Sequence, residues 1–147
     1  MHKIINLLRE PAMSDIDVDS LDRLSIHRRI LKRKKLLQNV FRDFHHSFMK
    51  LNNKYFSGDG LKIELGSGIA PVRDTYPEVL ATDMVYTPML DQILDAQDMD
   101  LADNSVRAMF AQNCFHHFPD PKIFFSELNR VLKPGAGIIL IEPYYGP

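Results

Sequence analysis

A glycine turn behind a short apolar segment is the first feature of the sequence that could hold a ligand. Residues 61–65 read LKIEL, and Gly66-Ser67-Gly68 follows directly. Glycine tolerates the backbone angles of a tight turn and lets a ligand approach bare backbone closely. A helix opening behind the turn would also offer free N–H groups to an anion. By itself the turn leaves a second interpretation open, because unrelated α/β proteins use the same pattern for packing.

An aspartate stands near the end of the second apolar segment. Asp83 lies in residues 79–84, 17 positions after Gly66. A carboxylate there can accept hydrogen bonds from both hydroxyls of a ribose, as it does in dinucleotide-binding enzymes. Asp83 therefore indicates a nucleoside-containing ligand without identifying it. An ordinary strand-end aspartate that caps a loop is the alternative.

The segments further along the chain carry several motifs in a fixed order. Asp95-Ala96 precedes Asp103-Asn104-Ser105, then His116-His117 precedes Asp120-Pro121, and residues 127–137 read ELNRVLKPGAG. Together with the glycine turn, this order resembles the class I S-adenosylmethionine-dependent methyltransferases, in particular the methyltransferase type 11 group, over residues 61–142. The resemblance implies methyl transfer from S-adenosylmethionine to an unidentified small-molecule, sugar or lipid-linked acceptor.

The resemblance also implies which residues contact the methionine part of the cofactor. Gly66, Ser67 and Gly68 would cradle it, while Glu64 would help to set the loop and bind the amino group. Ala70 departs from the pattern, because many relatives have a third glycine there.

A second group of residues would contact the nucleoside. Asp83 would hold the ribose, and Met84 would pack against the adenine. Asp95 would accept a hydrogen bond from the adenine amino group, while the backbone N–H of Ala96 would meet a ring nitrogen. Asn113 would lie beside the methionine part. No metal site is expected.

His116 and His117 are the candidates for a general base, because imidazole titrates near neutral pH. Methyl transfer is an in-line displacement on an already activated sulfonium, so orientation alone can supply most of the acceleration. A histidine at a strand-to-helix junction is also often a cap or a packing residue. We therefore favour the structural interpretation and leave the catalytic residue unassigned.

The elements that position these residues follow from alternating apolar segments and breakers. Strands are expected at residues 61–65, 79–84, 92–94, 106–111 and 137–142, and helices at 70–76 and 122–132. Asp120-Pro121 is expected to start the second helix, and Lys133-Pro134-Gly135 to end it. The predicted fold is α/β, a Rossmann-like and largely parallel sheet of strand order 3-2-1-4-5 flanked by helices, with an N-terminal helical extension.

Residues 1–56 are expected to form a leader and one long amphipathic cap helix, and residues 57–147 the cofactor-binding domain. Apolar residues recur at helical spacing from Leu37 to Phe48, which predicts a face that must be buried. Phe41, Phe44 and His45 or His46 are candidate lining residues of the acceptor site. Residues 27–35 contain six Lys or Arg in nine positions, for which a solvated helix face is preferred over a phosphate-binding patch.

Composition limits the remaining classes of function. A net charge of -1 gives no global attraction for nucleic acid, and no apolar run reaches the ~20 residues of a membrane span. Cys114 is the only cysteine, so an internal disulfide is excluded. A buried small residue is the favoured interpretation of Cys114. We expect a cytoplasmic protein.

The family's reversed hairpin after the fifth strand has no counterpart before Pro147. This leads us to expect a fragment of a longer enzyme, a partner subunit over the exposed sheet edge, or a noncatalytic cofactor-binding or interaction module. An open edge also predicts self-association. A nicotinamide-dependent oxidoreductase is a further alternative, although it accounts only for the glycine turn and Asp83.

Overall fold

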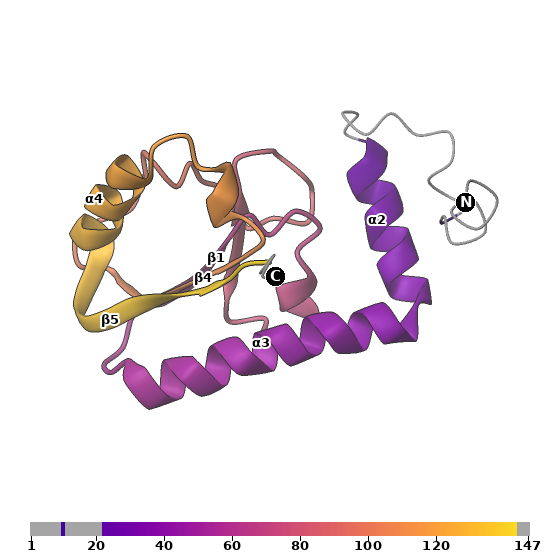
Figure 1. The fold of residues 1–147 in the computed structure, drawn as a ribbon, viewed down its shortest axis with the longest axis horizontal. Helices are drawn as coiled ribbons and strands as arrows, with labels where there is room; N and C mark the ends of the chain where they lie inside the picture. Colours follow the sequence, from indigo (N-terminus) through magenta and orange to yellow (C-terminus); the bar gives the residue numbers. More distant parts are fainter. Residues whose placement is uncertain (1–9, 11–21, 144–147) are drawn as a thin grey trace, which may run out of the picture. The chain divides into compact units, whose positions relative to one another are not determined.

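The computed structural model describes Glu10 and residues 22–143 (Figure 1). The chain divides into two compact units, Met1–Asn39 and Val40–Pro147. The second unit therefore contains the whole sheet and the C-terminal part of the long helix α3. No helix among the described residues has both the length and the apolar composition needed to cross a membrane.

A five-stranded, wholly parallel sheet forms the framework of the second unit. Its order is β3-β2-β1-β4-β5, which confirms the predicted fold class. The strands are β1 (Leu61–Leu65), β2 (Leu80–Asp83), β3 (Gln92–Ile93), β4 (Val106–Gln112) and β5 (Leu132–Ile141). Because β1, β2 and β4 are adjacent and parallel, their carboxyl ends open onto one edge of the sheet.

Helix α4 lies close to its predicted position, and strand β5 ends close to its predicted end but begins earlier. Helix α4 (Pro121–Val131) starts with Pro121 in its first turn, and the Asp120 side chain accepts hydrogen bonds from the next two free N–H groups. Strand β5 begins earlier than predicted, because Leu132 already pairs with Val106. Regular pairing resumes at Gly137, and the register shifts between these two points. Lys133-Pro134-Gly135 thus ends the helix as expected.

The predicted helix at residues 70–76 is wrong. A four-residue 3-10 helix, η2 (Pro71–Asp74), takes its place. Ala70 before it has a left-handed backbone with φ of 50°, and Tyr76 precedes Pro77, which disfavours helical geometry. No α-helix terminus therefore supports the glycine turn.

The single long N-terminal helix is also wrong. Two helices, α2 (Asp22–Arg33) and α3 (Lys35–Tyr55), are separated at Lys34. The side-chain amide of Gln38 donates to the carbonyls of Leu31 and Lys32 and caps the end of α2. Basic residues in the last turn of α2 suit its negative terminus, whereas the first turn of α3 has no acidic residue.

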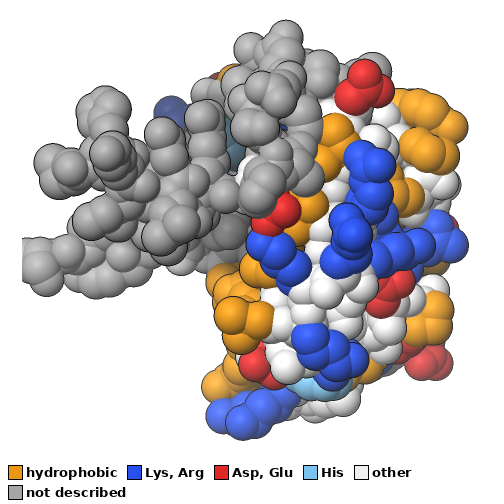
Figure 2. Space-filling view, turned by 90° about the vertical axis from the view of Figure 1, so that its right-hand side faces the viewer, with side chains coloured by type: hydrophobic (Ala, Val, Ile, Leu, Met, Phe, Trp, Pro, Cys, Tyr) orange, Lys and Arg blue, Asp and Glu red, His pale blue; other side chains and the backbone are white. Residues whose placement is uncertain are grey.

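The basic run lies on solvated surface. Arg29 and residues 32–35 are exposed, and Lys34 pairs with Glu10. In Figure 2 several Lys and Arg side chains adjoin one another, with hydrophobic and acidic side chains around them. This arrangement agrees with the preferred interpretation of a solvated helix face.

Two hydrophobic clusters cover the two faces of the sheet. Helix α4 packs Phe124, Leu128 and Val131 against one face. On the other face Phe48 of α3 stacks on Phe110 of β4, with ring centroids 5.1 Å apart. Figure 1 shows α3 and α4 on opposite sides of the sheet. The C-terminal part of α3 therefore contributes Phe48 to the core of this unit.

We expect Phe48→Ala to lower the free energy of unfolding by about 3–5 kcal/mol, because Phe48 is 1% exposed and its removal leaves a cavity beneath the sheet. Urea denaturation measures the change. Tyr55→Ala on the same helix is the control, since Tyr55 is 64% exposed. Equal effects of the two substitutions would contradict the packing of α3 on the sheet.

Candidate functional site

The glycine turn after β1 is held against two neighbouring strand ends. Ser67 N–H donates to the carbonyl of Thr82 in β2 at 2.9 Å, and Gly68 N–H donates to the Asp83 carboxylate at 2.9 Å. On the other side, a Cβ added to Gly66 would lie 2.5 Å from Cys114 Sγ, behind β4. The three strand ends that the sequence singled out therefore meet.

The two glycines of the turn have different environments. Both have positive φ, +64° at Gly66 and +51° at Gly68, a conformation that side chains disfavour. Gly66 is tightly packed against Cys114, whereas a Cβ at Gly68 would meet nothing within 4 Å. The backbone at Gly68 is therefore open to the approach of a ligand.

Two backbone N–H groups hold the Asp83 carboxylate, which can still accept further hydrogen bonds. One carboxylate oxygen accepts from Gly68 N–H and the other from Val85 N–H, both at 2.9 Å. A carboxylate has about four acceptor positions, so two remain for the hydroxyls of a sugar. Met84 beside it is 67% exposed, an apolar side chain available to a flat ring.

The predicted adenine-binding segment adjoins Asp83. Leu94 N–H donates to the Asp83 carbonyl at 3.0 Å, which brings Asp95 and Ala96 next to the end of β2. Asp95 is exposed, and its carboxylate accepts from Gln97 N–H at 2.8 Å. Ala96 is buried. This segment therefore continues the same edge of the sheet.

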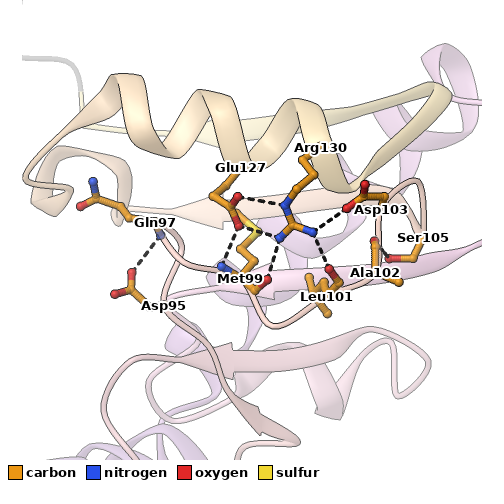
Figure 3. A network of polar contacts seen from close by, with 9 residues as sticks. All are labelled: Asp95, Gln97, Met99, Leu101, Ala102, Asp103, Ser105, Glu127 and Arg130. Carbon is orange, nitrogen blue, oxygen red and sulfur yellow. Dashed lines mark hydrogen bonds and ion pairs between the residues drawn. The ribbon is translucent and has the colours of Figure 1, made fainter.

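A polar network from α4 fixes the loop behind Asp95 (Figure 3). The Arg130 guanidinium donates to the carbonyls of Met99 and Leu101, each at 2.7 Å, and to Asp103 at 2.8 Å. Glu127 binds Arg130 and also accepts from Met99 N–H at 2.9 Å. Hydrogen bonding to Arg130 lowers the pKa of Glu127 and keeps it charged.

Sequence reasoning used Glu127 and Arg130 only as marks of a family and missed their role in positioning the loop. Their spacing of three residues on a predicted helix would have indicated an ion pair. The contacts of Arg130 with residues 99–103 had no local signal, because about 30 residues separate the partners.

Glu64 lies behind the glycine turn and is 3% exposed. Its carboxylate is hydrogen-bonded to the Ser67 hydroxyl, and His45 Nε2 of α3 lies 3.6 Å from its other oxygen. Burial raises the pKa of Glu64 to about 7, against a weaker lowering by Ser67. Burial, with His46 nearby, lowers the pKa of His45 to about 4. The two groups therefore do not form a salt bridge at neutral pH, because burial disfavours both charges.

The segment after β4 carries the remaining candidates. Asn113 is exposed, with φ of 50°, and its N–H donates to the Ile141 carbonyl at 2.8 Å. Burial, and then the charge of Asp83, raise the pKa of Cys114 to about 12. Cys114 is thus a neutral thiol that packs against Gly66, and it is half-buried where a buried residue was predicted. Within the described residues no group of three or more His, Cys, Asp or Glu could hold a metal ion.

The two histidines differ in their partners. His116 Nδ1 lies 2.5 Å from a carboxylate oxygen of Glu142, just beyond β5, while His117 contacts His116 by its ring, with centroids 4.0 Å apart. Glu142 was not among the predicted site residues. The 26 positions between His116 and Glu142 leave no local pattern by which the sequence could have revealed the pair.

The candidate acceptor-site residues of the N-terminal helix have different environments in the structure. His45 is buried beside Glu64, whereas His46 is exposed and bonds the Tyr76 hydroxyl at 2.8 Å. Phe41 and Phe44 are half-buried, and Phe41 contacts the His45 ring at 6.3 Å between centroids. No described contact links these four residues to Asp83, so their proposed acceptor role stays a prediction.

Comparison with known proteins adds an independent finding. A family model described as a methyltransferase domain matches residues 66–140. The phosphoethanolamine N-methyltransferase 2 of Caenorhabditis elegans is 40% identical over 52 residues, which are 35% of this chain and 12% of that protein.

Solved structures with the same fold agree. A protein from Methanococcus maripaludis assigned as an S-adenosylmethionine-dependent methyltransferase superimposes with a TM-score of 0.61 at 14% identity, over 86% of this chain and 65% of that one. A protein from Bacillus halodurans assigned as a methyltransferase gives 0.52 at 22% identity, over 67% and 50%. The chain therefore spans less than two thirds of the length of these relatives.

Glu64→Gln should change how stability depends on pH. Between pH 4.5 and 7 the folded chain keeps a proton on Glu64 that the unfolded chain loses, so this contribution to the free energy of unfolding falls as pH rises. His45 acts in the opposite sense between pH 4 and 6.5, where only the unfolded chain binds the proton.

Glutamine cannot ionise, so the variant should gain stability over the parent chain as pH rises from 4.5 to 7, by roughly 1–3 kcal/mol. Urea denaturation at several pH values measures the difference. Asp59→Asn, at an exposed carboxylate, should show no such trend. A difference for Glu64→Gln that is constant with pH would contradict the buried, protonated carboxyl.

The lysine in Arg130→Lys keeps the positive charge, but its single ammonium group cannot bind the loop carbonyls, Asp103 and Glu127 at the same time. The amides of residues 95–105 should then exchange with solvent at least about tenfold faster, because local opening becomes easier. Hydrogen exchange by mass spectrometry measures the rates. Arg29→Lys, on the exposed face of α2, is the control, and unchanged protection in Arg130→Lys would refute the network's role.

Proposed function

Because the chain belongs to the methyltransferase domain family, we propose that it transfers a methyl group from S-adenosylmethionine, the donor used by this family, to a small-molecule, sugar or lipid-linked acceptor. The observation that carries the proposal is the join between the glycine turn and β2. There the Gly68 N–H donates a hydrogen bond to the Asp83 carboxylate, and the Gly68 backbone is open to the approach of a ligand.

The residues present suit the cofactor on physical grounds. A Cβ at Gly68 would fill the space into which the turn opens, and Asp83 retains acceptor capacity for two hydroxyls. We propose that Gly66, Ser67 and Gly68 cradle the methionine part and that Asp83 holds the ribose. The burial of Glu64 behind Ser67 favours the loop-setting part of its predicted role over direct contact with the amino group.

The nucleoside end of the site follows from neighbouring residues. We propose that Met84 packs against the adenine, that Asp95 accepts from the adenine amino group, and that Ala96 N–H meets a ring nitrogen. The Arg130 network supports this segment by removing its freedom before the ligand arrives, which lowers the entropic cost of binding. Asn113 would lie beside the methionine part.

When bound, the cofactor supplies an activated methyl group. The chain's contribution is then to hold that group and the acceptor in line and to exclude water, which can account for about 7–11 kcal/mol of the barrier in well-oriented reactions. Cys114 takes no nucleophilic part, because its raised pKa keeps it protonated.

The acceptor is left to experiment, since the described relatives are longer than this chain and acceptor pockets vary within one fold. Phosphoethanolamine is the first compound to assay, on the strength of the local similarity to the C. elegans enzyme. A cytoplasmic location and self-association through the sheet edge stay predictions. Cofactor binding without turnover would favour the noncatalytic alternative.

Asp83→Asn should weaken binding of S-adenosylhomocysteine roughly 10- to 100-fold, because a charged acceptor for the ribose is lost. Isothermal titration calorimetry measures the affinity. Asp100→Asn removes one negative charge at an exposed position and should leave the affinity unchanged. If the folded parent chain does not bind the compound at all, the proposed function is wrong.

A further inference from the structure

His116 and Glu142 form a dyad at the end of β5, next to the proposed cofactor site. His116 Nδ1 and a Glu142 oxygen are 2.5 Å apart. The other oxygen of Glu142 accepts from the N–H groups of Cys114 and Phe115, at 2.9 and 2.8 Å. Because Cys114 also packs against Gly66, Cys114 links the dyad to the glycine turn.

The hydrogen bonds around Glu142 favour its charged form. Partial burial raises the pKa of Glu142, but the bonds from His116, Phe115 and Cys114 together lower it, so the carboxylate is charged. When the His116 ring is in its neutral form, this carboxylate can accept the Nδ1 proton. This leaves Nε2 of His116 with a lone pair, the arrangement of a general base oriented by an acid.

A cavity of about 390 Å³ adjoins the dyad and is lined by Phe115, His116, Glu142 and Pro143. This volume falls in the range of roughly 300–1,000 Å³ typical of small-molecule sites. Two of the four lining residues are apolar and the other two are the dyad itself. His116 is half-exposed, with 47% of its side chain accessible, so the ring can be reached from the cavity.

We propose that this cavity receives the methyl acceptor and that His116, oriented by Glu142, takes the proton of a hydroxyl or amine group on it. The inference rests on the proposed function and names the class of acceptor. The apolar walls suit a ring or short hydrocarbon, and the Glu142 charge disfavours a carboxylate or phosphate close to the reacting atom.

The proposed step balances in atoms and charge. The acceptor oxygen or nitrogen forms a bond to the methyl carbon as the bond from that carbon to the sulfonium sulfur breaks, and sulfur keeps the electron pair. The acceptor's proton passes to Nε2 of His116, and the resulting imidazolium is stabilised by the Glu142 carboxylate. Solvent then removes that proton. Glu142 is a positioning residue, and His116 is the catalytic one.

The first test needs no natural acceptor. In the complex with S-adenosylhomocysteine, long-range 1H–15N spectra should show His116 protonated on Nδ1 and bare on Nε2. Phenol, a neutral protic probe with an apolar body, should shift the Nε2 resonance saturably by donating to it. Anisole, which has no proton to donate, should not, and benzoate should not bind.

Two variants distinguish the effect of the dyad from that of the neighbouring histidine. Glu142→Gln should abolish the tautomer bias and the response to phenol, whereas His117→Gln should keep both. A proton on Nε2 in the parent chain, equal responses to phenol and anisole, or an unchanged response in Glu142→Gln would each overturn the inference.

Activity gives a second readout. With tritiated S-adenosylmethionine and phenol, His116→Gln should lower turnover about 10²- to 10⁴-fold. Its affinity for S-adenosylhomocysteine should stay within about twofold of the parent. Undiminished turnover would overturn the inference while the proposed function stands. Loss of cofactor binding in the parent chain would instead remove both.

Discussion

The hydrogen bond from Gly68 N–H to the Asp83 carboxylate joins the first strand's turn to the end of the second strand. It can form only because β1 and β2 are parallel and in register, with Glu64 opposite Ala81. The same parallel arrangement on the other side aligns Leu65 with Ala111 of β4 and brings Cys114 against Gly66. The pairing of the strands thus determines where the residues at this edge of the sheet lie relative to one another.

Burial separates the ionisable groups of this edge into two kinds. Glu64 and His45 are buried and Cys114 is half-buried, and loss of hydration favours the neutral form of each. Glu142 lies nearer to solvent and accepts several hydrogen bonds, which favour its charge. The ionisable groups around the turn therefore favour their neutral forms, whereas Glu142 beside the cavity favours its charged form.

Several distant segments hold this edge in place. Helix α3 supplies Phe48 beneath β4 and His45 behind Glu64, so a helix predicted as a cap is also part of the core. Helix α4 holds the loop of residues 99–103 through Arg130. The family motif around Glu127 and Arg130 can thus be understood as a clamp on the segment next to Asp95.

The sequence by itself determined the parallel α/β fold, the strand order, and the meeting of the Gly66 turn, Asp83 and Asn113 at one edge. The elements followed from apolar runs and breakers that are local in the chain, and the strand order and the place of Asn113 followed from the family resemblance that the motifs indicate. It did not determine the short η2 helix, the break at Lys34 or the partners of His116 and Arg130. Left-handed Ala70, the capping amide of Gln38 and contacts across about 30 residues depend on tertiary packing. Because such contacts join residues that no period or spacing relates, only the folded chain could reveal them.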